Sequence, residues 1–464
     1  MSSAEPLAPG SRLGGFLIGD CVHQGAHARL YRVQCAESQA DPGCALVLKQ
    51  PRTDDGDAAD LRRFEVEHQT LRVLSGPHVP RLLDAEDAAQ PPWLVMEAIE
   101  GASLQQRLDQ PALPAVEEVV GLGVALAQAV HGLHQQHGVH LGLRPDRVRL
   151  TNEGRVVLLG YGLSWHAHHP DLHAGLKGAE AGEAGWMAPE QLLGVRGDPR
   201  SDIFALGAIL YQLLTHELPH GLPDSEAGLR QRLWREPPPP RRWRPEIPAW
   251  LQEVLLRCLA PEPAQRYPSA AHLAFDLRHP QQVRVTARSE SLQPAPAWTQ
   301  WRRWWRAQRL LHGAAPAVRP ARVLSEVPIV LLAVPPEDTP TETLHALRRA
   351  ALRVLGTRPG ARLACVTVLV PTARGDSLAQ RRQLAALQRW AQGLEGPGHQ
   401  TSCHVLMAPD VATALLDWAQ RNAVSDLVLG AGAVASEGVA VRVARQAACN
   451  VQLVRAAPGE RLTG

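Results

Sequence analysis

Lysine is nearly absent from this chain of 464 residues, whose basic side chains are almost all arginine. Only Lys49 and Lys177 occur. A lysine ammonium is a compact point charge that suits contact with phosphate groups. Lys49 closes the apolar run Ala45–Leu48, which is typical of a buried strand. Because lysine is so rare here, its presence at this position is more informative than an ordinary surface lysine would be.

Histidine and cysteine are the other side chains with obvious ligand chemistry. Four histidines lie close together at His166, His168, His169 and His173. A metal site is one interpretation of them, but no ligand spacing is enforced, which favours a solvated, irregular loop. The seven cysteines, at positions 21, 35, 44, 258, 365, 403 and 449, include no CxxC pair. This pattern argues against a disulfide framework and a zinc site, so we expect no metal and a reducing cytoplasm.

The composition is that of a soluble globular protein with two to four domains. Hydrophobic residues make up 45% and charged residues 20% of the chain, and the net charge of +2 gives no reason to expect nucleic acid as a partner. Residues 1–15 read as a flexible tail without the charged start and apolar run of a signal peptide. No stretch approaches the ~20 continuous apolar residues of a transmembrane helix.

The elements that must position Lys49 form a β-rich unit followed by a helical one. Strands are expected at 16–21, 28–35, 45–50, 81–86 and 93–97, with one helix at 58–74. Beyond Gly101 the pattern changes to helices at 116–136, 201–215, 250–259 and 269–277. A β-rich lobe that precedes a helical lobe predicts an α+β arrangement.

The second half of the chain has a different organisation. Residues 280–325 are rich in proline, arginine and tryptophan and read as a linker. After it, strands are expected at 328–334, 362–370, 402–407, 426–430 and 450–454, alternating with helices at 341–355, 378–394, 411–421 and 439–447. Alternation with nearly continuous apolar strands predicts a parallel sheet covered on both faces.

Several motifs in the first 280 residues, in the same order, resemble those of the bacterial Hanks-type Ser/Thr protein kinases. Ala45–Lys49 resembles the strand with the phosphate-binding lysine, and Glu67 stands where the family has the glutamate that pairs with it. Leu94–Glu97 resembles the adenine-facing strand. His140 lies in the part that resembles the catalytic loop, Glu190 at the end of the activation segment and Asp202 at the start of the following helix. Arg266 corresponds to the family's arginine that pairs with this glutamate. The resemblance implies a bilobal α+β protein-kinase-like fold over residues 16–279.

The departures from the family lie where its chemistry happens. Gly142 replaces the catalytic aspartate, Arg147 the metal-binding asparagine, and Gly160 the aspartate that holds the main magnesium ion. Glycine offers no ligand, and arginine puts a positive charge where a divalent cation would sit. We therefore expect this domain to be a pseudokinase that has no catalytic residues and binds no magnesium.

The nucleotide-binding positions are only partly kept. The glycine-rich loop is reduced to Gly25, and the resemblance leaves Gly25, Lys49, Glu67, Met96 and Glu97 as the nucleotide contacts if ATP binds. The alternative is that Lys49 and Glu67 form a purely structural ion pair. His140, Glu190, Asp202 and Arg266 are expected to be structural, with His140 packed in the core. The activation segment has lost both its phosphorylatable threonine and the arginine that would read it, which Leu141 replaces.

The linker carries a basic, aromatic segment at residues 298–311. On a helix, Trp298, Trp301 and Trp305 would lie along one side. Such a helix could bind a membrane surface. Packing against a domain or a dimer partner is the alternative, and the short length and flanking domains favour it.

Residues 326–456 resemble the universal stress protein family in their order of strands and helices and in the phrases Ser425–Gly430 and Ala448–Arg455. In ATP-binding members a glycine-rich loop follows the fourth strand. Here the loop is shortened, and Gly430, Gly432 and Gly438 are its remaining glycines. Either nucleotide binding at the strand ends or a packing and dimerisation role is open. The resemblance implies an α/β parallel-sheet domain, followed by a tail at 457–464.

The sequence thus predicts a cytoplasmic bacterial signalling protein with a catalytically inactive kinase-like domain. It would act as a scaffold for protein partners or as a nucleotide-dependent regulator, with a homodimer through the C-terminal domain as one possibility. The competing hypothesis is a weakly active or atypical ATP-dependent Ser/Thr kinase. ATP is the one cofactor that either version could use.

Overall fold

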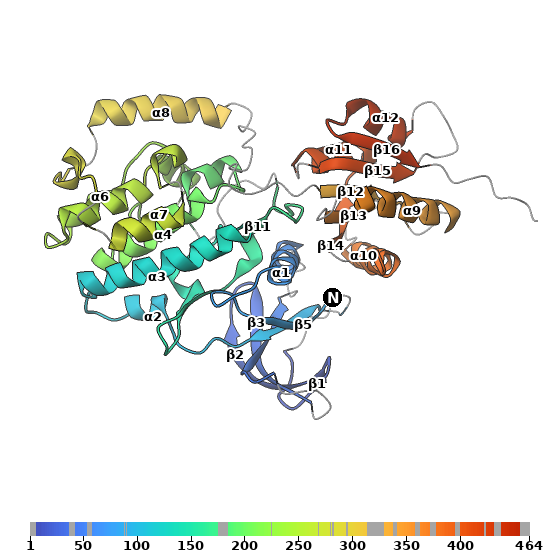
Figure 1. Ribbon diagram of the computed structural model, residues 1–464, viewed down its shortest axis with the longest axis horizontal. Coiled ribbons are helices and arrows are strands. Elements are labelled where there is room, and N and C mark those ends of the chain that lie inside the picture. The colour runs from blue at the N-terminus through green and yellow to red at the C-terminus, as the bar shows by residue number, and fades with distance from the viewer. Residues whose placement is uncertain are drawn as a thin grey trace, which may run out of the picture.

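A sheet-based lobe, a helical lobe and a second α/β unit follow one another along the chain in the computed structural model (Figure 1). The structure describes residues 6–36, 42–52, 58–87, 89, 91–174, 184–223, 225–267, 269–278, 280, 283–293, 296–312, 329–336, 341–357, 362–371, 377–394, 400–421, 424–430 and 438–454. Gly432, Lys177, the C-terminal tail and residues 313–325 of the expected linker lie outside these ranges.

The first lobe is a six-stranded antiparallel sheet in the order β1-β2-β3-β4-β6-β5, with one helix. Its elements are β1 Arg12–Leu13, β2 Phe16–Gln24, β3 Ala28–Cys35, β4 Leu46–Pro51, α1 Ala58–Leu71, β5 Leu82–Glu86 and β6 Trp93–Glu97. Side chains of β3 alternate, so Tyr31 and Val33 enter the core with Leu48. The predicted bounds of β3 and β6 are confirmed.

Helix α1 ends at Leu71, earlier than the predicted Leu74. The last turn tightens, because the N–H of Val73 donates to the carbonyl oxygen of Thr70 at 3.2 Å. Gly76 then adopts a φ of 103°, directly before Pro77. Proline disfavours helical geometry in the residue before it, so the helix is not resumed at Gly76.

The helical lobe is built around α3 and α4. Its elements are β7 Ala102–Ser103, α2 Leu104–Leu108, α3 Val116–Gln135, β8 Gly138–Val139, η1 Pro145–Arg147, β9 Val148–Leu150, β10 Val156–Leu158, η2 Tyr161–Leu163, β11 Trp165–His166, η3 Pro189–Leu193, α4 Arg200–Thr215, α5 Glu226–Arg230, η4 Gln231–Leu233, η5 Pro240–Arg242, α6 Ala249–Cys258, η6 Pro263–Gln265, α7 Ala270–Arg278 and η8 Ala287–Ser289. In the described part of the chain, α3 alone is long and apolar enough to cross a membrane, a test that core helices of soluble proteins also pass. Leu126 and Val130 of α3 are fully buried in this lobe.

The expected linker is not without structure. Residues 287–289 pack on α6, where Nε2 of Gln252 donates to the carbonyl oxygen of Ser289 at 2.9 Å. Helix α8 then spans Ala297–His312 and lies on the outer side of the helical lobe (Figure 1). A basic, tryptophan-rich segment has therefore formed a helix within the region that was read as a linker.

The C-terminal unit is a five-stranded parallel sheet in the order β14-β13-β12-β15-β16. Its elements are β12 Ile329–Ala333, α9 Thr341–Thr357, β13 Arg362–Leu369, α10 Ser377–Ala391, β14 Gln400–Met407, α11 Val411–Arg421, β15 Val424–Gly430, α12 Val439–Gln446 and β16 Asn450–Val454. Val330 and Leu332 face one apolar core, and Leu331 faces the other. The predicted parallel sheet with two covered faces is confirmed.

Candidate functional site

Two residues expected at the phosphate end of a nucleotide site form an ion pair. Lys49 lies on β4, and its Nζ is 2.5 Å from Oε2 of Glu67 on α1. The Glu67 side chain is 4% exposed and that of Lys49 19%. A carboxylate buried this deeply needs a cation to offset its lost hydration. The pair therefore fixes the approach of α1 to the sheet, whatever else Lys49 binds.

The other candidate nucleotide contacts lie on the same sheet. Gly25 occupies the turn between β2 and β3, where its N–H donates to the carbonyl oxygen of Ala28 at 3.0 Å. A Cβ on Gly25 would stand 3.0 Å from Nε2 of His23, so this imidazole lies against the turn. Met96 is buried in β6, and Glu97 is its last residue. The structure thus gathers all five candidates on the sheet and α1, and shows direct contact for Lys49 with Glu67.

Asp202 on α4 holds the backbone of the loop that would carry catalysis. Its two carboxylate oxygens accept the N–H groups of His140 and Leu141, each at 2.8 Å. Leu141 has a φ of 59°, a left-handed conformation that costs a non-glycine residue about 1–3 kcal/mol. Hydrogen bonds to a buried carboxylate offset that cost. The loop therefore keeps a defined backbone conformation although its chemical side chains have changed.

His140 is a buried core residue, fully enclosed by protein. Its Nε2 donates to the carbonyl oxygen of Leu159 at 3.1 Å, and its Nδ1 accepts the N–H of Gly142 at 3.3 Å. Burial lowers the pKa of His140 to about 4, and the nearby cation of Arg147 acts in the same direction. Both ring nitrogens are engaged and the ring is neutral, so His140 has a structural place rather than that of a base.

Arg147 fills the volume that side chains at positions 142 and 160 would need. Its Nη1 donates to the carbonyl oxygen of Gly142 at 2.9 Å. A Cβ on Gly142 would stand 2.4 Å from that nitrogen, and a Cβ on Gly160 would stand 2.9 Å from Cδ of Arg147. Real side chains do not tolerate such approaches. The three altered positions, which sequence reasoning treated one by one, therefore form a single packing unit.

Gly160 keeps the backbone geometry of its position, with φ 75° and ψ 58° in the left-handed region. Tyr161 follows it, and its ring lies 4.9 Å from that of His140. The Tyr161 hydroxyl is buried and has no hydrogen-bond partner among the described residues. Burial, and then the carboxylate of Glu67, raise the pKa of Tyr161. No local pattern of residues predicts that this hydroxyl would be enclosed.

A buried hydroxyl pair ties α1 to the segment after Gly160. Oγ1 of Thr70 lies 2.8 Å from Oγ of Ser164, which also donates to the carbonyl oxygen of Tyr161 at 2.6 Å. Both side chains are buried. Sequence reasoning missed this contact, because residues 94 positions apart give no periodic signal.

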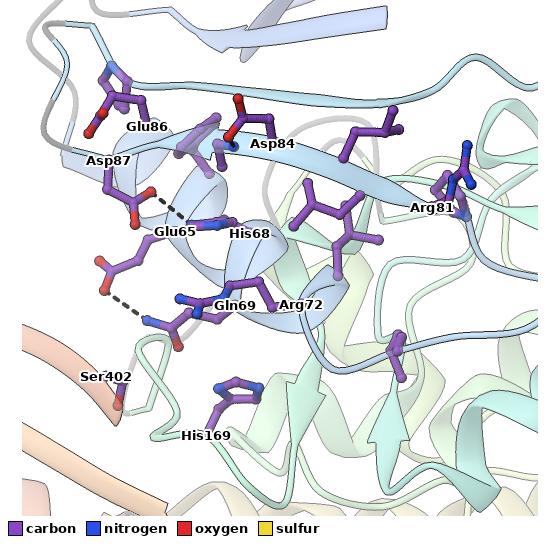
Figure 2. A pocket seen from close by; sticks show the side chains of 18 of the residues that line it. Glu65, His68, Gln69, Arg72, Arg81, Asp84, Glu86, Asp87, His169 and Ser402 are labelled. Carbon is purple, nitrogen blue, oxygen red and sulfur yellow. Dashed lines mark hydrogen bonds and ion pairs between the residues drawn. The ribbon is translucent and has the colours of Figure 1, made fainter. Parts of the chain in front are cut away.

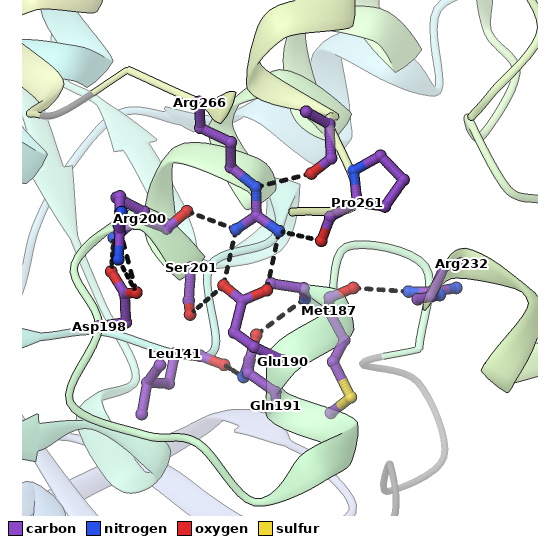
Figure 3. Close-up of polar contacts among 12 residues, drawn as sticks. Leu141, Met187, Glu190, Gln191, Asp198, Arg200, Ser201, Arg232, Pro261 and Arg266 are labelled. Atoms are coloured by element: carbon purple, nitrogen blue, oxygen red, sulfur yellow. Dashed lines mark hydrogen bonds and ion pairs between the residues drawn. The ribbon is translucent and has the colours of Figure 1, made fainter. Parts of the chain in front are cut away.

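The end of the activation segment is closed by a buried ion pair (Figure 3). Arg266 binds both carboxylate oxygens of Glu190, at 2.6 and 2.7 Å. Its remaining donors reach the carbonyl oxygens of Ala260, Arg200 and Pro261. Ser201 donates to Glu190 at 2.6 Å. Because every donor is satisfied, the pair is an architectural fixture that links this segment to the helical core.

The four histidines do not form the solvated loop that the sequence predicted. His166, His169 and His173 are buried, so the solvated interpretation is wrong for them. Nε2 of His166 lies 2.7 Å from the carbonyl oxygen of Gln136, and Nε2 of His173 lies 2.9 Å from that of Gly162. Over the described residues no group of three or more His, Cys, Asp or Glu side chains is placed to hold a metal ion. These imidazoles pack the segment against the helical lobe.

Two of the three candidate glycines of the C-terminal unit, Gly430 and Gly438, lie at the carboxyl edge of its sheet. Gly430 ends β15, and Gly438 precedes the first turn of α12, where no side chain caps the helix. Gly432 belongs to the part of the chain outside the described residues. A Cβ on Gly430 would stand 3.3 Å from Cγ2 of Thr343, so α9 approaches this strand end closely.

The outer face of α1 meets the C-terminal unit around a cavity of about 1680 Å³ (Figure 2). Helix α1 contributes Glu65, His68, Gln69 and Arg72 to its lining, and Ser402 of β14 lies opposite. Near this cavity, Nδ1 of the buried His404 lies 3.4 Å from Oε1 of Glu65. Helix α1 therefore carries Glu67 toward the sheet and a second, polar face toward the C-terminal unit.

Comparison with known proteins relates this geometry to one family model. Residues 23–276 match the model of the protein kinase domain. The chain is 34% identical over 236 residues to the serine/threonine-protein kinase Pkn1 of Myxococcus xanthus, 28% over 272 residues to a probable serine/threonine-protein kinase of Streptomyces coelicolor, and 28% over 219 residues to the serine/threonine-protein kinase PknB of Mycolicibacterium smegmatis. These alignments cover 49, 57 and 46% of this chain, but only 33, 40 and 35% of the three relatives. The chain therefore spans less than half the length of these relatives.

Proposed function

Because the chain belongs to the protein kinase domain family, we propose that it is a signalling protein of bacterial type whose kinase domain is catalytically inactive. In this proposal residues 16–279 bind protein partners as a scaffold or respond to a nucleotide, and the universal stress protein-like residues 326–456 form a second regulatory unit. The proposed location is the cytoplasm, and a homodimer through the C-terminal unit is one form that it could take.

The observation that carries the proposal is the guanidinium of Arg147 between Gly142 and Gly160. A positioned base contributes about 10²–10⁴ in rate to proton transfer, and metal charge neutralisation adds several kcal/mol. Neither the base nor oxygen ligands for magnesium are present at these positions, and a fixed cation repels a divalent one. Phosphotransfer at the usual place is therefore expected to be near background.

The cations that are present near the expected phosphate site support a response to a nucleotide. The Lys49–Glu67 pair is intact, and Arg147 supplies a second cation near Tyr161 and His140. Two cations could bind the phosphate groups of ATP without magnesium. The contact of Glu65 on α1 with His404 of the C-terminal unit offers a route by which such binding would affect the protein outside the site.

The competing function is a weakly active, atypical Ser/Thr kinase. The ion pairs Lys49–Glu67 and Glu190–Arg266 favour it, because both belong to the assembled form of a kinase domain. It would require a base and a metal ligand from elsewhere in the chain or from a partner.

Thermal unfolding of the full chain with ATP, in the presence of magnesium or of EDTA, separates these functions. A ligand at a hundredfold excess over its Kd stabilises the folded state by about 2.7 kcal/mol. A stabilisation that EDTA leaves unchanged, without transfer of labelled γ-phosphate to a peptide mixture or to the protein itself, supports a nucleotide-dependent regulator. No stabilisation at millimolar ATP leaves the scaffold, and magnesium-dependent phosphotransfer would overturn the inactive assignment.

A further inference from the structure

Helix α8 presents a row of tryptophans away from the protein. Trp298 and Trp301 are 61% exposed, and Trp305 is 49% exposed. Their spacing of three and four residues puts them on one face of the helix. The rings of Trp301 and Trp305 meet edge to face at 6.1 Å. Indoles are seldom left in water, and a contiguous exposed apolar patch marks an interaction site.

The opposite face of α8 is already occupied by the helical lobe. Ala307 is 2% exposed, and Arg303 forms an ion pair of 2.8 Å with Glu236. Arg306 reaches Glu262 at 2.5 Å. Packing against a domain, the interpretation that the sequence favoured, thus accounts for this inner face. It does not account for the outer row of Trp298, Trp301 and Trp305, which the lobe leaves uncovered.

The segment of sequence that carries the row is strongly basic. Residues 280–325 contain eight arginines and one acidic residue, Glu290, which is a charge of +7 against +2 for the whole chain. On the helix itself, Arg302 stacks over the ring of Trp298 at 5.7 Å, and Arg309 is exposed. No acidic side chain occurs between Ala297 and His312. A partner for this face must therefore be negatively charged and also accept indole rings.

We propose that this face of α8 docks on an anionic lipid surface. Tryptophan prefers the boundary between headgroups and acyl chains, and arginine pairs with anionic headgroups beside it. A helix held by Arg303 on its inner face and by Arg306 on its flank can lie flat on such a surface without unfolding. A second copy of the chain is a poorer partner, since both copies would bring the same positive charge. Single-stranded nucleic acid uses a groove that follows its backbone, whereas this row is a ridge.

Co-flotation of the full chain with vesicles tests the proposal. The two vesicle types are phosphatidylcholine alone and phosphatidylcholine mixed with phosphatidylglycerol. The anionic vesicles should bind at least about tenfold more protein, and high salt should reduce that binding. Trp298→Ser/Trp301→Ser/Trp305→Ser should abolish it, and Arg302→Gln/Arg309→Gln should weaken it several-fold. Arg303 and Arg306 stay in place because they anchor the helix.

A matched control replaces apolar residues that are exposed elsewhere, Val22→Ser/Leu113→Ser/Leu222→Ser, and should bind vesicles like the parent. Thermal unfolding checks that each variant is folded. Three results would overturn the proposal: equal binding to both vesicle types, binding that survives the tryptophan substitutions, and no binding at all. A dimer that the tryptophan substitutions dissociate would assign the face to a second copy, and selective capture of an oligonucleotide would assign it to nucleic acid.

Discussion

The guanidinium of Arg147 donates to the carbonyl oxygen of Gly142 and occupies the space into which any side chain at position 142 would project. The relationship runs both ways. Arginine fits at position 147 because the residue facing it lacks a Cβ, and a carboxylate could return to position 142 only if Arg147 gave way. The residues at positions 142 and 147 are therefore coupled, and placing a carboxylate at position 142 alone should not be neutral.

Gly142→Asp is predicted to destabilise the protein by about 1 kcal/mol, because Arg147 would have to move away and give up its hydrogen bond to the carbonyl oxygen of Gly142. Combining it with Arg147→Asn should recover most of that loss. Urea denaturation of the two single variants and the double variant measures the coupling. Gly121→Asp is the matched control, since Gly121 is exposed on α3 and no atom lies within 4 Å of its Cβ position. Additive effects in the double variant would show that the two positions do not share this space.

Arg266→Lys is predicted to lower the free energy of unfolding by about 2–3 kcal/mol although the charge is kept. Lysine could hold one oxygen of Glu190, but it would leave the carbonyl oxygens of Ala260 and Pro261 without their donors. Urea denaturation again provides the measurement. Arg230→Lys, in an exposed pair with Glu226, should change stability by less than about 0.5 kcal/mol. An equally small effect at Arg266 would contradict the role assigned to its fork of hydrogen bonds.

The buried His173 predicts a loss of stability in acid. Burial, and then the cation of Arg196, lower the pKa of His173 to about 3, whereas a histidine in an unfolded chain titrates near 6.5. Between these values the unfolded chain binds a proton that the folded protein does not. The free energy of unfolding therefore keeps the full contribution of neutral His173 above about pH 6.5. It decreases by about 1.4 kcal/mol per pH unit as the pH falls from there toward 3. His140, with a pKa of about 4, acts in the same direction.

His173→Gln should flatten the pH dependence between about pH 6 and pH 4 by nearly one proton, because glutamine can still donate to Gly162 without titrating. The measurement is the free energy of unfolding as a function of pH for parent and variant. His345→Gln, at an exposed position on α9, serves as the control. Identical slopes for His173→Gln and the parent would mean that His173 is protonated in the folded protein.

Much of this architecture could be predicted from local signals. Alternation placed β3 and a continuous apolar run placed β6 within their observed bounds, and the spacing of the tryptophans identified the face of α8 that the structure leaves exposed. Motif order placed Lys49 opposite Glu67, and the structure joins them. These features follow from periodicity or from a pattern of residues whose spacing a fold fixes.

The remaining features depend on contacts between side chains and backbone groups of different loops. The packing of Arg147 between Gly142 and Gly160 can be recognised only once the conformation of the loop is known. Likewise, a histidine-rich segment is predicted to be exposed unless the carbonyl oxygens that it contacts are known. His173 finds Gly162 eleven positions away in irregular backbone, where no period applies. Such contacts are set by the tertiary structure. The composition of the segment alone therefore led to the wrong prediction that these histidines are exposed to solvent.

The backbone at the altered positions predicts how far the chemistry can be restored. Gly160 has left-handed geometry, which aspartate tolerates better than most residues, and Asp202 still holds the loop through His140 and Leu141. The triple variant Gly142→Asp/Arg147→Asn/Gly160→Asp should therefore place the family's ligand set on an unchanged frame. We expect it to show magnesium-dependent stabilisation by ATP that the parent lacks, measured by thermal unfolding.

The control for this restoration is the pair Gly142→Asp/Gly160→Asp, in which Arg147 remains. If Arg147 occupies the space of the metal ligands, this double variant should be less stable than the parent, and its stabilisation by ATP should not depend on magnesium. The reason is that the two new carboxylates would bind the guanidinium of Arg147 and not a metal ion. Equal magnesium dependence in the double and triple variants would show that Arg147 swings aside and does not block the site. Since the three positions form one packing unit, the release of Arg147 should be the step that admits the metal.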